Sequence, residues 1–156
     1  MCAALVSCAG DKGNLFEGDI YAVTDDIASS YDFDDAVFYK DSDEYAKDTL
    51  MFMYGIEDEA VLEAIEKFTF STPGTNSAKT FAMLLFKEGT TAETIDAAEK
   101  AVRDVYLANL ITTTAVYDMT QSEIADKATF VKYDNALAVI AYDATGNADI
   151  VAAINE

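Results

Sequence analysis

The stretch TFAMLLF, residues 80–86, decides the fold because it is apolar on both of its faces. In an extended chain, odd-numbered side chains lie on one face and even-numbered side chains on the other. A strand that is apolar on both sides needs cover on both sides, which places it in the interior of a sheet. The stretch ALAVIAY, residues 136–142, has the same character and predicts a second interior strand.

Each interior strand has a neighbour in the sequence that reads as a partner strand. Residues 68–71 alternate Phe with Thr or Ser, as in a strand with one exposed face. Residues 129–133 precede the second interior strand across a tight turn at 134–135. Two such hairpins predict a four-stranded antiparallel sheet, with the interior strands in the centre and the strands at Phe68 and Phe130 on the edges.

A long helix is expected between the two hairpins. Thr90 and Glu93 have the spacing of a capping box. From there to about residue 116, residues that suit a packed face repeat at intervals of three and four, so one face of the helix should pack on the sheet. These residues are Ile95, Ala98, Val102, Val105 and Asn109. A short helix near 122–126 and a closing helix at 147–154 complete this half of the chain.

The first half of the chain reads as short helices. Residues 18–31 carry an apolar stripe opposite an acidic face, which is typical of an amphipathic helix. Further short helices are expected at 45–54 and 57–64. Residues 32–45 show no sustained period and predict an acidic loop, in which a short strand at 36–40 is the alternative.

These patterns predict the α+β fold class. The core is ββαββα: a four-stranded antiparallel sheet with the long helix packed on one face, preceded by short N-terminal helices. A chain of 156 residues is long enough to bury such a core as one domain, which we place at residues 18–156.

The strong negative charge limits the partners. Asp and Glu number 29 against 10 Lys and Arg, which gives a net charge of −19, and the excess is concentrated in residues 17–66. Such a surface repels phosphate backbones and anionic lipid headgroups, so neither nucleic-acid binding nor electrostatic membrane binding is expected. A basic partner or a cation is compatible with it.

The sequence contains no histidine. This excludes Ser-His-Asp and Cys-His catalysis and zinc sites that need His ligands. The only cysteines are Cys2 and Cys8, close together at the start, so no disulfide can tie the core and no cysteine-rich metal cluster can form.

Leu5-Val6-Ser7-Cys8 resembles the lipobox of bacterial lipoproteins, in which the cysteine becomes the first mature residue and carries acyl chains. Residues 9–14 then read as a flexible polar tether, so residues 1–17 are expected to be a signal remnant and lipid-anchor tether. Residues 1–7 lack the basic residues and apolar length of a whole export signal, so further signal residues are expected upstream. The alternative is an ordinary N-terminus with an incidental cysteine.

A wider resemblance covers residues 48–154. It is carried by Tyr54-Gly55-Ile56 before an acidic helix, by Arg103 within the long helix, and by the segment VYDMTQSEIADKATFVKYDNALAVIAYD. Together with the lipobox, these features resemble a domain-of-unknown-function family of small lipoproteins from Gram-positive gut bacteria. Asp134-Asn135 stands where that family favours a glycine-containing turn. The resemblance implies lipid anchoring at Cys8 and an α+β domain outside the membrane, and it implies no activity.

Three acidic or polar motifs are candidate ligand sites, each with a structural alternative. Carboxylates at 32–35 and 41–44 have short spacings that suit calcium, but neither continues as an EF-hand loop, and a solvated acidic loop is the stronger interpretation. Residues 143–149 also gather oxygen ligands, although Asn147 reads better as the cap of the last helix and Asp149 as a first-turn charge.

Residues 74–80 resemble a phosphate-binding loop only superficially, because the second glycine is missing and a strand follows, so a polar hairpin loop is predicted. Arg103, the only arginine, is expected to pair with Glu99 and lay its stem over the sheet rather than bind a carboxylate ligand.

The sequence therefore favours a lipid-anchored protein on the outer face of the cell membrane, with a non-enzymatic binding or scaffold domain. Its lipid attachment residue is Cys8, and no cofactor is expected. Its expected partner is an unknown protein or a basic ligand, and its contact with the membrane is the anchor alone. The alternatives are a module for a cation or basic peptide, and a hydrolase that uses only carboxylates, Tyr and Lys.

Overall fold

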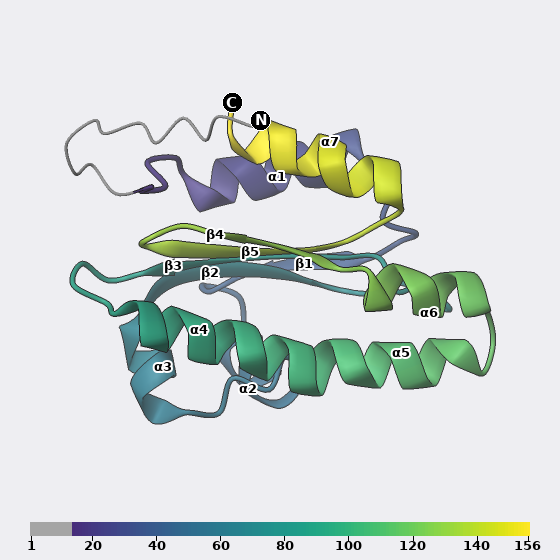
Figure 1. Cartoon of the computed structure of the whole chain (residues 1–156), viewed down its shortest axis with the longest axis horizontal. Coiled ribbons are helices and arrows are strands. Elements are labelled where there is room, and N and C mark those ends of the chain that lie inside the picture. Colours follow the sequence, from purple (N-terminus) through teal and green to yellow (C-terminus); the bar gives the residue numbers. More distant parts are fainter. Residues whose placement is uncertain (1–13) are drawn as a thin grey trace, which may run out of the picture.

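The computed structural model describes residues 14–156, in which helices cover both faces of one β-sheet (Figure 1). The chain runs through α1 (Ile20–Ser30), β1 (Val37–Lys40), α2 (Ala46–Phe52), α3 (Glu59–Ala64), β2 (Ile65–Thr72), β3 (Thr80–Phe86), α4 (Ala92–Ala101), the π-helical segment η1 (Val102–Leu107), α5 (Ala108–Ala115), α6 (Met119–Asp126), β4 (Thr129–Lys132), β5 (Ala136–Ala141) and α7 (Ala144–Ile154). The α+β class is as predicted.

The sheet has five antiparallel strands in the order β1-β2-β3-β5-β4. The predicted four strands are all present and β3 and β5 are central, but the prediction of a four-stranded sheet was wrong by one strand. The additional strand is β1, the alternative within the acidic loop, whose Tyr39 pairs with Phe70. It moves β2 from the predicted edge to the interior, while β4 remains an edge strand.

β2 is buried on both faces over residues 68–71 rather than half exposed, because α1 covers one face and Phe68 and Phe70 belong to the core on the other. Its polar residues point into the helix layer instead of solvent: the Thr69 hydroxyl lies 2.7 Å from that of Thr24 on α1, and Ser71 is fully buried. Polar side chains at alternate positions thus mark a buried hydrogen-bonding face here.

The alternation in β3 divides the core between the two faces. Phe81 and Met83 pack with α1 and α7 on one side. Ala82, Leu84 and Phe86 pack on the other side, where the remaining helices lie (Figure 1). Within the described residues, no helix has the length and apolar character needed to cross a bilayer.

The predicted long helix exists, but its packed face shifts by one residue halfway along. The turn at η1 contains one residue more than an α-helical turn. Tyr106 and Leu110 therefore take the packed positions, and the predicted packing of Val105 and Asn109 on the sheet was wrong, since both are exposed. Ile95, Ala98 and Val102, which precede the shift, are buried as predicted.

Two predicted helix caps lie elsewhere. Thr91, not Thr90, caps α4 by accepting a hydrogen bond from the Thr94 backbone N–H. Asp143, not Asn147, caps α7 by accepting from the Gly146 backbone N–H at 2.8 Å. Thr91 and Asp143 both have the extended backbone angles that are typical of a residue that caps a helix N-terminus.

Asn14 and Phe16, which precede α1, are hydrogen-bonded to the turn between β4 and β5. Asn135 holds Phe16 by two bonds: the Phe16 N–H donates to Oδ1 at 2.8 Å and Nδ2 donates to the Phe16 carbonyl at 2.9 Å. The Asp134 N–H also donates to the Asn14 carbonyl. Residues 14–17, assigned to the tether from sequence, thus contact the folded body, and the Asn135 side chain explains why this turn carries no glycine.

Candidate functional site

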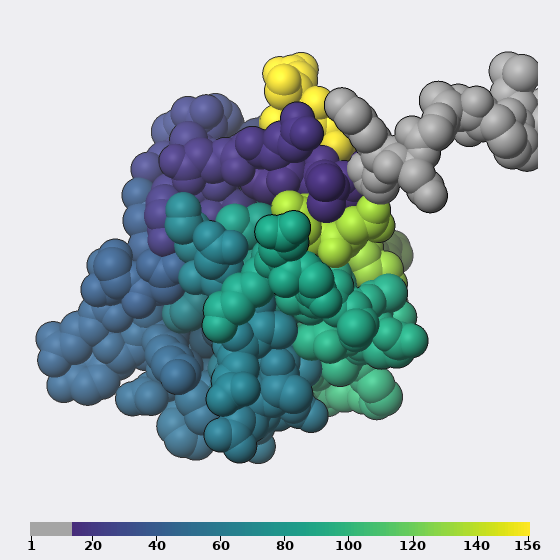
Figure 2. All heavy atoms as spheres, turned by 90° about the vertical axis from the view of Figure 1, so that its left-hand side faces the viewer, coloured from purple at the N-terminus to yellow at the C-terminus, as the bar shows by residue number. Residues whose placement is uncertain are grey.

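A groove of about 740 Å³ lies between α1 and α7, on the face of the sheet opposite α4. Figure 2 shows the residues that lead into α1 next to the end of α7 at one end of the molecule. The volume of the groove is within the range of known ligand sites. The groove brings together distant parts of the chain, with walls from within residues 14–31, from Tyr133 and from residues 153–156.

The floor of the groove is apolar. Phe16, Ile27 and Ile154 are buried beneath it, and Val23 is half buried in its wall. The ring of Tyr133 meets that of Phe16 edge to face with centroids 5.5 Å apart. These residues are held in place because Ile27 and Ile154 belong to the core between the helices and the sheet.

The Tyr133 hydroxyl fixes the end of α7 beside the groove. It donates to Oδ1 of Asn155 at 2.7 Å, while Nδ2 of Asn155 donates to the Val151 carbonyl. Burial raises the pKa of Tyr133, so its hydroxyl stays protonated and acts as a donor at neutral pH.

The rim of the groove is acidic. Glu17, Asp26 and Glu156 are exposed around it, and no Lys or Arg is among the described residues that line it. None of these three carboxylates forms an ion pair with another residue of 14–156. The neighbouring Asp25, in contrast, pairs with Lys40 at 2.8 Å.

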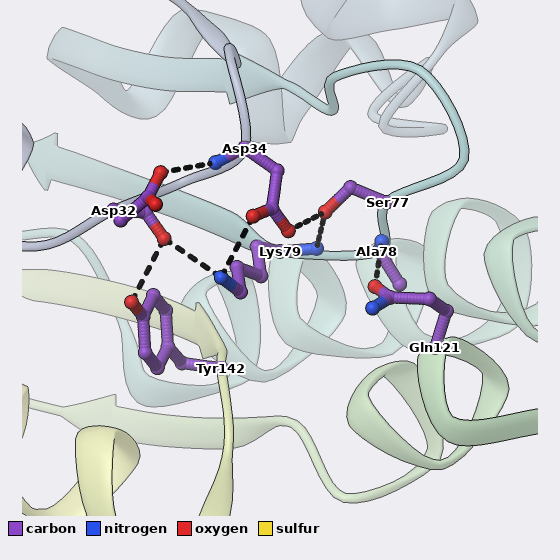
Figure 3. A network of polar contacts seen from close by, with 7 residues as sticks. All are labelled: Asp32, Asp34, Ser77, Ala78, Lys79, Gln121 and Tyr142. Atoms are coloured by element: carbon purple, nitrogen blue, oxygen red, sulfur yellow. Dashed lines mark hydrogen bonds and ion pairs between the residues drawn. The ribbon is translucent and has the colours of Figure 1, made fainter.

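A second polar cluster joins the loop before β1 to the loop between β2 and β3 (Figure 3). The Lys79 ammonium donates to Oδ1 of Asp34 at 3.0 Å and to the Asp32 carbonyl at 2.9 Å, and it lies 4.7 Å from the centre of the Tyr142 ring. The Ser77 hydroxyl donates to the other oxygen of Asp34 at 2.8 Å. The predicted polar hairpin loop is thus confirmed, and its polar residues hold two loops together.

The Asp34–Lys79 pair is stable in its charged form. Desolvation opposes the charge on each side chain, but the hydrogen bonds and the opposite charge outweigh it, so the pKa of Asp34 is lowered and that of Lys79 is raised. Ser77 therefore has no neutral lysine beside it to remove its proton.

Glu99, Tyr21 and Tyr106 also have pKa values that are shifted away from neutral pH. Desolvation raises the pKa of Glu99, but Arg103 and Lys132 lower it by more, so that the pKa is lowered overall. Burial, aided by a hydrogen bond to Asp41, raises the pKa of Tyr21 to about 12, and burial raises that of Tyr106 to about 12. Each shift favours the form that the group already has at neutral pH. None of these groups is prepared to exchange a proton there.

Carboxylates that were candidate calcium ligands, at 32–35 and 41–44, are engaged in internal contacts. Oδ1 of Asp32 accepts from the Asp34 N–H, Asp41 accepts from the Tyr21 hydroxyl at 2.8 Å, and Asp43 accepts from the Lys40 N–H at 2.7 Å. In residues 14–156, no three Asp, Glu or Cys side chains are placed together to hold a metal ion. The acidic loop is a set of turns stabilised by its own carboxylates.

The other two sequence candidates also have structural roles. Asn147 lies inside α7 rather than at its cap and donates to the Lys127 carbonyl at 3.3 Å, while its buried Oδ1 accepts no hydrogen bond from any residue of 14–156. Asp149 is exposed on the same helix. Arg103 donates to Oε1 of Glu99 from two nitrogens and lies 4.1 Å from the centre of the Phe130 ring, so its predicted structural role is confirmed.

Cys8, the predicted lipid attachment residue, lies outside the described residues. The groove was not predicted from sequence, because its walls come from segments more than a hundred residues apart and no local pattern joins them. Comparison with protein-family models, with curated proteins and with solved structures finds no match to this chain.

Proposed function

We propose that this protein is anchored by lipid at Cys8 to the outer face of the cell membrane, and that its α+β domain binds a partner without catalysing a reaction. The observation that carries the anchor is the lipobox-like Leu5-Val6-Ser7-Cys8. The resemblance to small lipoproteins of Gram-positive gut bacteria supports the same location.

The distance between Cys8 and the domain suits a surface protein. The folded body begins at Asn14, whose carbonyl accepts from Asp134. Six residues of extended chain reach about 20 Å at most. An acyl chain on Cys8 would therefore hold the domain near the bilayer without inserting it, while the negative charge of the domain disfavours direct contact with anionic headgroups.

Binding is favoured over catalysis by the titration behaviour of the side chains. A hydrolase that relies on carboxylates needs one of them protonated near neutral pH, which requires a raised pKa. For Asp34 and Glu99 the shift is in the opposite direction: desolvation raises their pKa values, but hydrogen bonds and the opposite charges of Lys79, Arg103 and Lys132 lower them overall. The groove, in contrast, offers an apolar floor with free carboxylates, which is a surface for a basic ligand.

The anchor is tested by labelling cells with an alkyne fatty acid. The full gene is expressed in a Gram-positive host as wild type, Cys8→Ala and Cys2→Ala. Wild type and Cys2→Ala should take up label and enter the membrane fraction, and Cys8→Ala should do neither. Cys2→Ala is the matched control because it removes the other thiol of the chain. Equal labelling of wild type and Cys8→Ala would disprove the anchor.

A further inference from the structure

We propose that the groove between α1 and α7 binds a segment of a partner protein in which apolar side chains alternate with Lys or Arg. This inference deepens the proposed binding function by naming the site and the chemistry of the partner. It does not depend on acylation of Cys8, so the two proposals fail separately.

The partly exposed apolar side chains at the edge and in the wall of the groove call for apolar side chains in the partner. Leu15 is 52% exposed at its edge, and Val23 and Tyr31 are half exposed in the wall formed by α1. Burying apolar surface is the main favourable term in protein association. A purely polar ligand would leave this surface without cover.

The rim requires positive charge in the same partner. Glu17 precedes α1, Asp26 projects from it and Glu156 follows α7, so carboxylates stand at several points around the apolar floor. They lack ion-pair partners within residues 14–156. An acidic segment would meet like charges on every side, whereas Lys or Arg would find a free carboxylate.

Single small cations do not fit this arrangement as well as a peptide does. The rim carboxylates belong to no group of three that is close enough to hold one metal ion within residues 14–156. They are spread along a groove of about 740 Å³, which suits charges separated along an extended or helical segment.

The test uses the full-length protein and two labelled peptides, one of alternating Lys and Leu and one of alternating Glu and Leu. Fluorescence anisotropy should show binding of the Lys/Leu peptide and none of the Glu/Leu peptide. The double variant Glu17→Gln/Asp26→Asn should weaken binding about tenfold, as expected for two exposed charge contacts. Hydrogen exchange should show that the bound peptide protects α1 and the end of α7.

The matched control is Glu57→Gln/Asp126→Asn, which removes the same charge from two exposed residues away from the groove. It should bind like wild type. Equal weakening in both double variants would mean that binding depends only on net charge and would overturn the proposal, as would absence of Lys/Leu binding.

Two other results would identify a different occupant. If the wild type self-associates and the groove variant does not, the occupant is a second copy of this chain. If Lys12→Glu raises peptide affinity, the occupant is the chain's own N-terminal segment. Either outcome overturns the proposal of a separate partner.

Discussion

The ring of Tyr54 stacks on the ring of Tyr106, with centroids 4.0 Å apart. The Tyr106 hydroxyl lies 2.6 Å from that of Thr80 on β3, and the Tyr54 hydroxyl donates to the Ser71 carbonyl on β2. Next to this pair, Gly55 packs against Val105. Tyr54 and Gly55, which follow α2, therefore pack together with the π-helical segment η1.

Gly55→Ala should destabilise the protein by about 2–4 kcal/mol. Gly55 has a φ of 78°, where an L-residue is strained, and a Cβ there would come within 2.5 Å of the Val105 Cβ. Gly89→Ala is the control, since Gly89 has a similar φ of 83° but open space around it. Urea unfolding should show a loss of about 1 kcal/mol for Gly89→Ala. Equal losses would mean that contact with Val105 is unimportant.

Asp34→Asn should lower the free energy of unfolding at pH 7 by about 1 kcal/mol. Asparagine keeps the size of the side chain and tolerates the positive φ of this residue, so the change removes mainly the charge. Because the folded-state pKa of Asp34 lies below 3.8, the pair stabilises the protein above that pH and loses this effect as pH falls through the lowered value. The difference between variant and wild type should therefore shrink in acid.

At the alkaline end the same pair depends on Lys79. Its pKa is raised above 10.5, so its contribution is present below that pH and is lost as pH rises through the raised value. Asp25→Asn is the control, because the Asp25–Lys40 pair is more exposed on both sides and should contribute at most a few tenths of a kcal/mol. A constant deficit of Asp34→Asn from neutral to acid pH would contradict the role of its charge.

Thr91→Ala should destabilise the protein by about 1 kcal/mol, because it removes the side chain that caps α4. Thr90→Ala should cost less: the Thr90 hydroxyl donates to the Lys87 carbonyl in an exposed turn and caps no helix. Thermal unfolding of the two variants compares them directly. A larger loss for Thr90→Ala would restore the capping box predicted from sequence.

The two interior strands β3 and β5 were predictable because their own residues are apolar on both faces. β3 begins and ends at the predicted residues, Thr80 and Phe86, since seven apolar or small side chains in sequence fit only an interior strand. The sequence of β1 does not distinguish a strand from a loop, because β1 is stabilised by pairing with β2, whose partner residues lie 29 to 35 positions later in the chain. The packed face beyond Val102 was mispredicted because a π-helical turn changes the helical period, and no residue type marks that change.

The candidate site was less predictable for the same reason. Short-range motifs indicated acidic and polar clusters, and the structure shows that the Asp41 carboxylate accepts from the Phe68 backbone N–H on β2 while that of Asp143 caps α7. The groove arises from the side-by-side position of α1 and α7, which depends on the sheet face that both helices cover. The spacing of residues in the sequence does not predict which helices pack on the same face of the sheet.

The placement at the cell surface depends on the chemical state of Cys8, and the mass of the native protein reports it directly. The protein is extracted from its own cells with a detergent that separates into two phases, and its N-terminal peptide is analysed by mass spectrometry. We predict recovery in the detergent phase with a chain that begins at Cys8 and carries a diacylglyceryl group on the sulfur. Recovery in the aqueous phase with an unmodified Cys8 thiol would contradict it.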